Sequence, residues 1–174
     1  NLLRKRGHIA GSGYLELWSL DNTLGLRVGR CQLDQLLEFF TKSNPKETGG
    51  LLIGHYTTSL DCAIVTKISG PPDDSEAGRT WFKRGTKGLT AMLSKYWKKG
   101  DYYLGEWHVH PGGSPIPSDI DRSQMNRIIQ TKNFECEEPV LILVGGTPTD
   151  YKLRILVYRA GANRGIELIQ TITP

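Results

Sequence analysis

Apolar positions along the chain change between the spacing of a helix and the spacing of a strand, which indicates a mixed fold. Residues 33–41 carry leucine and phenylalanine at helical spacing, and Asn44-Pro45 ends that segment. Two more helices are expected at Thr86–Lys98 and Asp119–Thr131. Short apolar or alternating runs predict strands at Tyr14–Leu20, Leu24–Gly29, Gly50–Gly54, Ala63–Ile68, Tyr102–His110, Val140–Gly145, Leu153–Tyr158 and Ile166–Ile172.

This order of elements predicts the fold class. It reads β-β-α-β-β, then an irregular segment that begins with a loop at Ser69–Gly78, then α-β-α-β-β-β, without an internal repeat. We expect one α/β (α+β) domain over residues 1–174, with a mixed central sheet flanked by helices and with residues 1–12 as a flexible N-terminal arm. A chain of 174 residues is long enough to bury a substantial core.

Composition excludes several classes of protein. Hydrophobic residues make up 38% of the chain and charged residues 23%, which is typical of a folded, soluble protein and not of a disordered one. No apolar run approaches the ~20 residues that span a bilayer. Cys31, Cys62 and Cys136 are widely spaced and form no CxxC pair, which favours the reducing cytoplasm over a disulfide framework.

The net charge of +4 is only mildly basic. Small positive clusters occur at Arg4-Lys5-Arg6 and around Lys95, Lys98 and Lys99. A solvated face or an N-terminal arm explains these clusters more simply than nucleic-acid binding does. We therefore expect neither nucleic acid nor a membrane as a partner.

The most informative motif is Trp107-His108-Val109-His110-Pro111, followed by Ser118 and Asp121. Two histidines that stand two apart on a strand project from the same face, and Asp121 follows at the start of an expected helix. Two imidazoles and one carboxylate suit Zn²⁺ held by three protein ligands, with a fourth position open as a catalytic metal requires. The motif predicts a zinc hydrolase with His108, His110 and Asp121 as ligands.

Each part of this motif also has a simpler explanation. Ser118 followed by Asp121 is an ordinary helix start, with serine as the N-cap and an acidic residue in the first turn. For that pair alone capping is the more frequent role, and Ser118 can serve both purposes. His108 and His110 alone could be strand histidines with satisfied hydrogen bonds. The combination at this spacing is what favours a metal site.

An upstream glutamate completes the pattern. Glu47 lies in Lys46-Glu47-Thr48-Gly49-Gly50, directly before an apolar run. With Glu47, the His-x-His-x(7)-Ser-x(2)-Asp array resembles the motif of the JAMM (MPN+) metallopeptidases, and the resemblance extends from about Arg27 to about Arg159. It implies a cytidine-deaminase-like JAMM/MPN core. Three segments are similar to the bacterial stand-alone deconjugases of CBASS-type antiphage operons. They are Gly105–Pro111, Gly70–Pro72 and Glu138–Gly146.

The predicted chemistry gives each residue a role. One catalytic Zn²⁺, held by His108, His110 and Asp121, lowers the pKa of a bound water toward ~7. Glu47 is the candidate general base, which takes the proton of that water and later delivers it to the leaving amine. Ser118 is expected to donate a hydrogen bond to the developing oxyanion.

The resemblance also implies a substrate. It points to cleavage after the C-terminal residue of a ubiquitin-like or CD-NTase protein conjugated to a target, which reverses E1/E2-like conjugation in bacterial antiphage defence. The expected partners are that C-terminal tail, its conjugated target and the E1/E2-like conjugating enzyme, in the cytoplasm. We expect the segment Ser69–Lys83 to flank the substrate groove, with Trp81 and Phe82 either in the groove or in the core.

Three alternatives stay open. A peptidase that processes ubiquitin-like or sulfur-carrier precursors would use the same site, because only the leaving amine differs. A non-catalytic MPN scaffold would have lost metal ligands, whereas this chain retains them. A DNA-associated relative of the RadC kind shares a related motif, but the weak basic clusters do not favour it.

Overall fold

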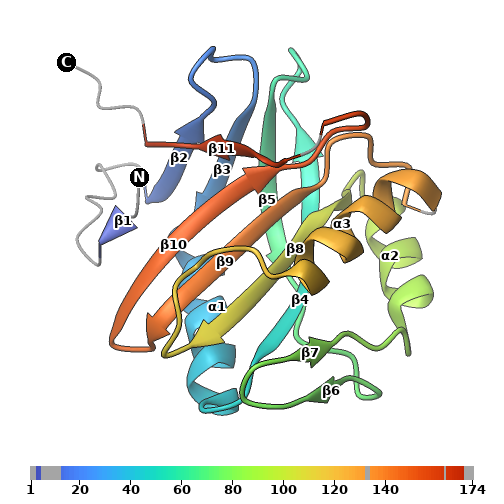
Figure 1. The fold of residues 1–174 in the computed structure, drawn as a ribbon. Coiled ribbons are helices and arrows are strands. Elements are labelled where there is room, and N and C mark those ends of the chain that lie inside the picture. The colour runs from blue at the N-terminus through green and yellow to red at the C-terminus, as the bar shows by residue number, and fades with distance from the viewer. Residues whose placement is uncertain (1–2, 5–12, 132–133, 163, 171–174) are drawn as a thin grey trace.

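One large mixed sheet runs through the molecule, and a two-stranded hairpin lies below it in the view of Figure 1. The computed structural model describes residues 3–4, 13–131, 134–162 and 164–170. The strand order of the large sheet is β1 (Leu3–Arg4), β10 (Asp150–Val157), β9 (Val140–Thr147), β8 (Tyr102–Pro111), β4 (Thr48–Tyr56), β5 (Cys62–Ile68), β3 (Gly25–Gly29) and β2 (Tyr14–Trp18), with β11 (Ile166–Leu168) also paired to β10. The pairs β8–β9 and β3–β5 are parallel and the others antiparallel, which confirms the mixed sheet predicted from the sequence.

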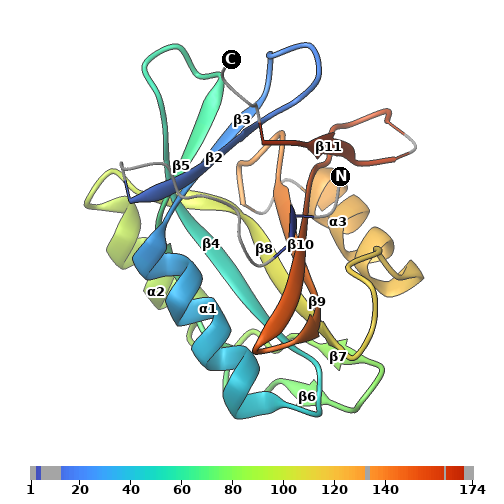
Figure 2. The same cartoon turned by 90° about the vertical axis from the view of Figure 1, so that its left-hand side faces the viewer.

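Helices cover both faces of this sheet. The helix α1 (Arg30–Ser43) lies along one face, and α2 (Leu89–Trp97) and α3 (Asp119–Thr131) lie on the other (Figures 1 and 2). Side chains of β9 alternate between the two cores, with Val140, Ile142 and Val144 on the α1 side and Leu141 and Leu143 on the α2–α3 side. Burial on both faces explains why this strand is an unbroken apolar run. None of the described helices has the length and hydropathy that a membrane crossing requires.

The helical spacing predicted for residues 33–41 is confirmed, because α1 buries Leu33, Leu36 and Phe40. The helix begins three residues earlier than the apolar spacing indicates, at Arg30. Its N-cap is Gly29, which offers no side chain to bond the first backbone N–H groups. The sequence therefore carries no capping signal at the true start of the helix.

The second helix begins later than predicted. The Asp74 carboxylate accepts hydrogen bonds from the backbone N–H groups of Thr86, at 3.0 Å, and of Lys87, at 2.9 Å. Gly88 then adopts a left-handed φ of +78°, so helical geometry starts only at Leu89. The acceptor lies twelve residues upstream, which is why local spacing did not locate the boundary.

The segment Ser69–Gly78, predicted as a loop, contains the short strand β6 (Glu76–Ala77), which pairs antiparallel with β7 (Phe82–Lys83). Two-residue strands have too few positions to show an alternating pattern. The prediction of an irregular loop was therefore wrong for these residues. The β6–β7 hairpin lies beside the beginning of β4, near the end of β8 (Figure 1).

The two ends of the large sheet approach each other at one corner. An isolated bridge joins Trp18, at the end of β2, to Ile169, just after β11, and each backbone N–H donates to the other carbonyl at 2.9 Å. Within the predicted N-terminal arm, the structure describes only Leu3–Arg4, which pair with β10 as β1. Residues 1–2 and 5–12 of that arm, and the end of the last predicted strand beyond residue 170, lie outside the described residues.

A glycine on β8 controls how closely β8 and β9 approach, and this gives a prediction. Gly105 has a φ of +150°, and a Cβ built on it would lie 1.9 Å from the carbonyl oxygen of Val140. We expect Gly105→Ala to lower the free energy of unfolding by about 3 kcal/mol or more, since strain and overpacking each cost roughly 1–3 kcal/mol. Gly112→Ala is the matched control, because Gly112 has a φ of +72° but no neighbouring atom within 4 Å. Its cost should be only about 1–2 kcal/mol, and equal costs in urea titrations would contradict the packing argument.

Candidate metal centre and active site

Glu47 directly precedes β4, and backbone contacts fix its position. Its N–H donates to the carbonyl of Gly78 at 2.9 Å, which ties it to the β6–β7 hairpin. In the β4–β8 register, Gly49 stands opposite His108. A Cβ on Gly49 would lie 2.6 Å from the Trp107 carbonyl oxygen, so only glycine allows this approach of β4 to β8. Gly49, two residues after Glu47, thus allows the carboxylate of Glu47 to lie next to the histidines.

His108 and His110 project from the same face of β8, as their spacing predicts, and their ring centroids lie 5.1 Å apart. Their side chains are 9% and 12% exposed. Trp107 points to the opposite face, where its ring stacks on Phe39 at 5.6 Å and its indole N–H donates to the carbonyl of Ser69 at 2.9 Å. The buried tryptophan therefore anchors the strand directly before the two histidines.

Asp121 lies in the first turn of α3, and its carboxylate faces both imidazoles. One oxygen lies 2.5 Å from His108 Nδ1, and the other lies 3.3 Å from His110 Nε2. The second oxygen also accepts hydrogen bonds from the backbone N–H and the hydroxyl of Ser118, both at 2.7 Å. In return, the N–H of Asp121 donates to the Ser118 hydroxyl oxygen at 3.1 Å. This reciprocal pair is a capping box, so the capping role weighed for Ser118 is confirmed.

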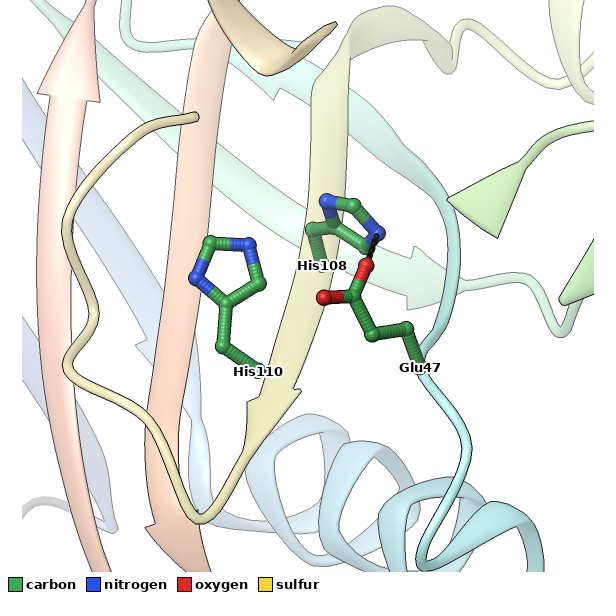
Figure 3. A group of neighbouring side chains, drawn as sticks. All are labelled: Glu47, His108 and His110. Carbon is green, nitrogen blue, oxygen red and sulfur yellow. Dashed lines mark ion pairs between the residues drawn. The ribbon is translucent and has the colours of Figure 1, made fainter. Parts of the chain in front are cut away.

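The structure brings all five residues singled out in the sequence into one site. Among the described residues, Glu47, His108 and His110 each offer a ligand atom within 4.8 Å of the others (Figure 3). Asp121 contacts both histidines, and Ser118 contacts Asp121. The assignment of Asp121 as third ligand and Glu47 as general base stays a prediction, as does a role for Ser118 at an oxyanion.

A buried nitrogen atom without a hydrogen-bond partner shows whether these residues are suited to bind a metal ion. His108 Nε2 is buried and has no hydrogen-bond partner among the described residues, and the nearest Glu47 oxygen lies 3.4 Å away. Leaving a buried imidazole nitrogen without a partner costs free energy unless a ligand uses it. An imidazole nitrogen close to a second imidazole and to a carboxylate, here those of His110 and Glu47, is what a divalent cation of borderline softness requires. The donor set therefore fits a metal ion.

A pocket of about 560 Å³ extends from the site between the hairpin, β8 and α3. Trp81 and Phe82 both line it, Trp81 at 42% exposure and Phe82 buried with its ring centroid 5.2 Å from that of His108. The wall of the pocket also contains Arg84 and Glu106, for which the sequence predicts no role. Glu106 stands two residues before His108, so the strand alternation that pairs the histidines also applies to it. Arg84 lies outside any regular spacing and gave no signal.

A sequence model of the family described as prokaryotic homologs of the JAB domain matches residues 31–156, which is most of the chain and includes every residue of the site. The chain belongs to the prokaryotic JAB-domain family. This confirms the resemblance to JAMM metallopeptidases that the sequence motif indicates.

Relatives in this JAB-domain family carry names that state an activity. A CD-NTase/cGAS isopeptidase of Enterobacter hormaechei is 45% identical over 121 residues, which cover 70% of this chain and 67% of the relative. A CD-NTase/cGAS isopeptidase of Pseudomonas aeruginosa is 29% identical over 76% of this chain and 85% of its own. A probable metalloprotease of Sinorhizobium fredii is 26% identical over 68% of this chain and 74% of its own. All three names describe peptidases, and the last name together with the Glu47–His108–His110 group supports a metal at the site.

The fold of this JAB-domain chain is also similar to a solved structure. The solution structure of a Desulfitobacterium hafniense protein superposes with a TM-score of 0.58 and covers 83% of this chain and 88% of that one. The two sequences are only 17% identical, so this likeness concerns the fold alone.

In this JAB-domain protein, the surroundings of Glu47 and Asp121 shift the pKa values of the two carboxyl groups in opposite directions. Burial raises the pKa of Glu47, partly offset by His108 and His110. Burial alone would also raise the pKa of Asp121, but hydrogen bonds from both histidines and from Ser118 lower it well below its usual range. Asp121 therefore stays ionised, which its predicted role as a ligand requires, while Glu47 has the greater tendency to accept a proton.

We expect Asp121→Asn to lose bound metal, because an amide is a much weaker ligand than a carboxylate. Removing a supporting residue alone typically costs 10–100-fold in metal affinity, and we expect a loss greater than ~100-fold for a ligand. Metal content after dialysis, measured by mass spectrometry, checks this. Asp119→Asn is the control, because that carboxylate lies in the same helical turn but is 96% exposed. If Asp121→Asn kept its full metal content and Glu47→Gln lost its metal, Glu47 would be the ligand and Asp121 would not.

The free energy of unfolding of the metal-free protein should depend on pH through the protonation of His110. Burial lowers the pKa of His110, but the hydrogen bond and charge of Asp121 outweigh it and raise the pKa above its usual value. Protonated His110 therefore stabilises the fold fully below the unfolded pKa of ~6.5, and this contribution is lost as pH rises through the higher folded pKa. Urea titrations of chelator-treated protein from acidic to alkaline pH should show this fall. His110→Asn should lack it, and an equal fall in that variant would refute the assignment.

Proposed function

We propose that this protein is a zinc-dependent isopeptidase that cleaves after the C-terminal residue of a carrier protein attached to a target. The carrier is a CD-NTase or a ubiquitin-like protein joined by an E1/E2-like enzyme, and cleavage reverses that conjugation in bacterial antiphage defence. One observation supports this above all others. Glu47, His108 and His110 lie within reach of one ion, with Asp121 against both imidazoles, in a chain 45% identical to a CD-NTase/cGAS isopeptidase.

Zinc is the proposed metal because of the donor set. Two imidazole nitrogens and one carboxylate, with a position left for water or substrate, are typical of catalytic zinc sites. His108, His110 and Asp121 would hold the ion. When bound, Zn²⁺ polarises the scissile carbonyl and makes a water molecule acidic enough to give hydroxide near neutral pH.

Side chains of the protein transfer the protons and stabilise the developing charge. Glu47, whose pKa is raised by burial, accepts a proton from the attacking water and delivers it to the leaving amine. The Ser118 hydroxyl, which donates to Asp121 in the structure, turns toward the oxyanion that develops on the scissile carbonyl. No covalent intermediate forms, because no nucleophilic side chain is involved.

Two features of the molecule support this proposed setting. Cys31, Cys62 and Cys136 are free thiols, which supports a cytoplasmic location alongside the conjugating enzyme. The pocket of about 560 Å³ between the hairpin and α3 opens at the metal site and gives an extended tail a path to it.

Cleavage of defined conjugates tests the proposal. We would fuse a bacterial CD-NTase and a ubiquitin-like protein through their C-terminal residues to a reporter, once as a linear peptide and once as a lysine isopeptide. We expect cutting at the junction that stops on chelation and returns with Zn²⁺. Glu47→Gln should reduce turnover by at least ~10²-fold, the usual minimum for a general base, and should keep its metal. Cutting of the linear substrate alone would favour the processing peptidase instead.

Ser118→Ala is a second variant for the same assay. We expect turnover to fall by roughly 10²–10³-fold if Ser118 serves the oxyanion. The melting temperature of the metal-free variant reports the loss of the cap separately. A lower melting temperature with unchanged turnover would leave capping as the role of Ser118. Absence of cutting with every carrier, while zinc is bound, would overturn the proposed activity.

A further inference from the structure

The segment that contains the β6–β7 hairpin, residues 74–87, is closed on itself by hydrogen bonds. The carboxylate of its first residue, Asp74, accepts hydrogen bonds from the backbone N–H groups of its last two residues. At the opposite end, the N–H of Gly78 donates to the carbonyl of Trp81 at 2.9 Å and closes the turn between the two strands. Because both ends are tied, these residues form one unit, which we call the hairpin unit.

Two side chains of the hairpin unit lie on the face of β8 that carries the histidines. Phe82 packs on His108, with ring centroids 5.2 Å apart, and the guanidinium of Arg84 lies 2.9 Å from a carboxylate oxygen of Glu106. Phe82 and Arg84 are two residues apart, as are Glu106 and His108, so the two contacts lie side by side along the strand. The hairpin unit is thus attached to β8 immediately beside the metal site.

The ion pair between Arg84 and Glu106 is buried, since the two side chains are 9% and 10% exposed. Arg84 Nε also lies 3.1 Å from the same Glu106 oxygen, and Arg84 Nη1 donates to the carbonyl of Gly85 at 3.0 Å. The amide of Gln124 lies 3.5 Å from that Glu106 oxygen. Charge-assisted hydrogen bonds in several directions fix the guanidinium, whereas the apolar contact of Phe82 has no preferred direction. The ion pair therefore fixes the position of the hairpin unit on β8.

The turn of the hairpin unit contacts the backbone of Glu47. The carbonyl of Gly78 accepts a hydrogen bond from the N–H of Glu47 at 2.9 Å. Pairing between β4 and β8 begins one residue later, at Thr48, so this N–H finds its partner in the hairpin unit and not in the sheet. A shift of the hairpin unit would move the partner of Glu47. Misplacing a catalytic group by ~1 Å can reduce a rate ~10²-fold.

We propose that the Arg84–Glu106 ion pair positions Glu47 for proton transfer. The ion pair holds the hairpin unit on β8, and the hairpin unit holds the backbone of Glu47 through the carbonyl of Gly78. Arg84 and Glu106 are positioning residues, because they act through the hairpin unit and not on the reacting atoms. The inference rests on the proposed function, which makes Glu47 the general base.

Hydrogen exchange of the Glu47 amide, followed by NMR on the full chain, tests the positioning without any turnover. We expect Arg84→Gln to speed this exchange at least ~10-fold, because loss of a buried ion pair lets the hairpin unit open more often. Glu106→Gln and the double variant should give the same increase, since either change alone removes the pair. Amides of β9 report unfolding of the whole domain and should change less.

Unchanged exchange at Glu47 in both single variants overturns the inference. An equal increase at Glu47 and throughout β9 also overturns it, because the ion pair would then only stabilise the fold. Arg84→Lys keeps a positive charge beside Glu106, so its exchange should fall between those of wild type and Arg84→Gln. Arg27→Gln is the matched control and should leave the exchange of Glu47 unchanged, because Arg27 forms its ion pair with Glu16, at 2.9 Å, between β3 and β2.

Turnover of the defined conjugates connects the position of Glu47 with catalysis. In Arg84→Gln and Glu106→Gln, kcat should fall ~10-fold or more, while the metal content after dialysis stays that of wild type, because the predicted ligands are retained. Fast exchange at Glu47 with the kcat of wild type overturns the inference. If wild-type protein cuts no conjugate although the exchange responds as expected, the proposed function fails and the hold of the ion pair on Glu47 stands, so the two failures are distinguishable.

Discussion

β8 is paired antiparallel with β4 on one side and parallel with β9 on the other, and both of its faces are packed. Its side chains alternate, so Trp107 and Val109 enter the core under α1 while His108 and His110 face α3. A slip of one residue in either pairing would exchange these faces and bury the imidazoles in an apolar core. The metal site therefore depends on the same register that builds the sheet.

This dependence explains which features could be predicted. The helical spacing of Leu33, Leu36 and Phe40 and the continuous apolar run of β9 both reflect burial, and burial leaves a pattern that sequence alone shows. The start of α2 depends on the carboxylate of Asp74, which reaches Thr86 and Lys87 from another part of the chain. Such contacts leave no local signal. For the same reason the two-residue strands of the hairpin were not predicted.

The residues of the candidate site likewise fall into those that could be predicted from the sequence and those that could not. His108 and His110 are set by strand alternation, and Asp121 by its distance from the Ser118 cap, so their proximity could be expected from spacing. Glu47 needs the β4–β8 pairing, which the sequence does not specify, and the family motif alone placed it with the histidines. The ion pair of Arg84 with Glu106 had no such guide, because Arg84 reaches β8 from an irregular segment. Residues with a regular spacing or a family motif were therefore predictable, and Arg84, which has neither, was not.

The bridge between Trp18 and Ile169 joins the first long strand to the end of the last one. In Figure 1 this corner lies at the upper side of the sheet, and the hairpin and the start of β4 lie at the lower side. Each of these two residues satisfies a backbone N–H and a backbone carbonyl of the other, groups that would otherwise face solvent at the ends of two strands. The bridge therefore leaves less free strand edge at this corner for another chain to pair with.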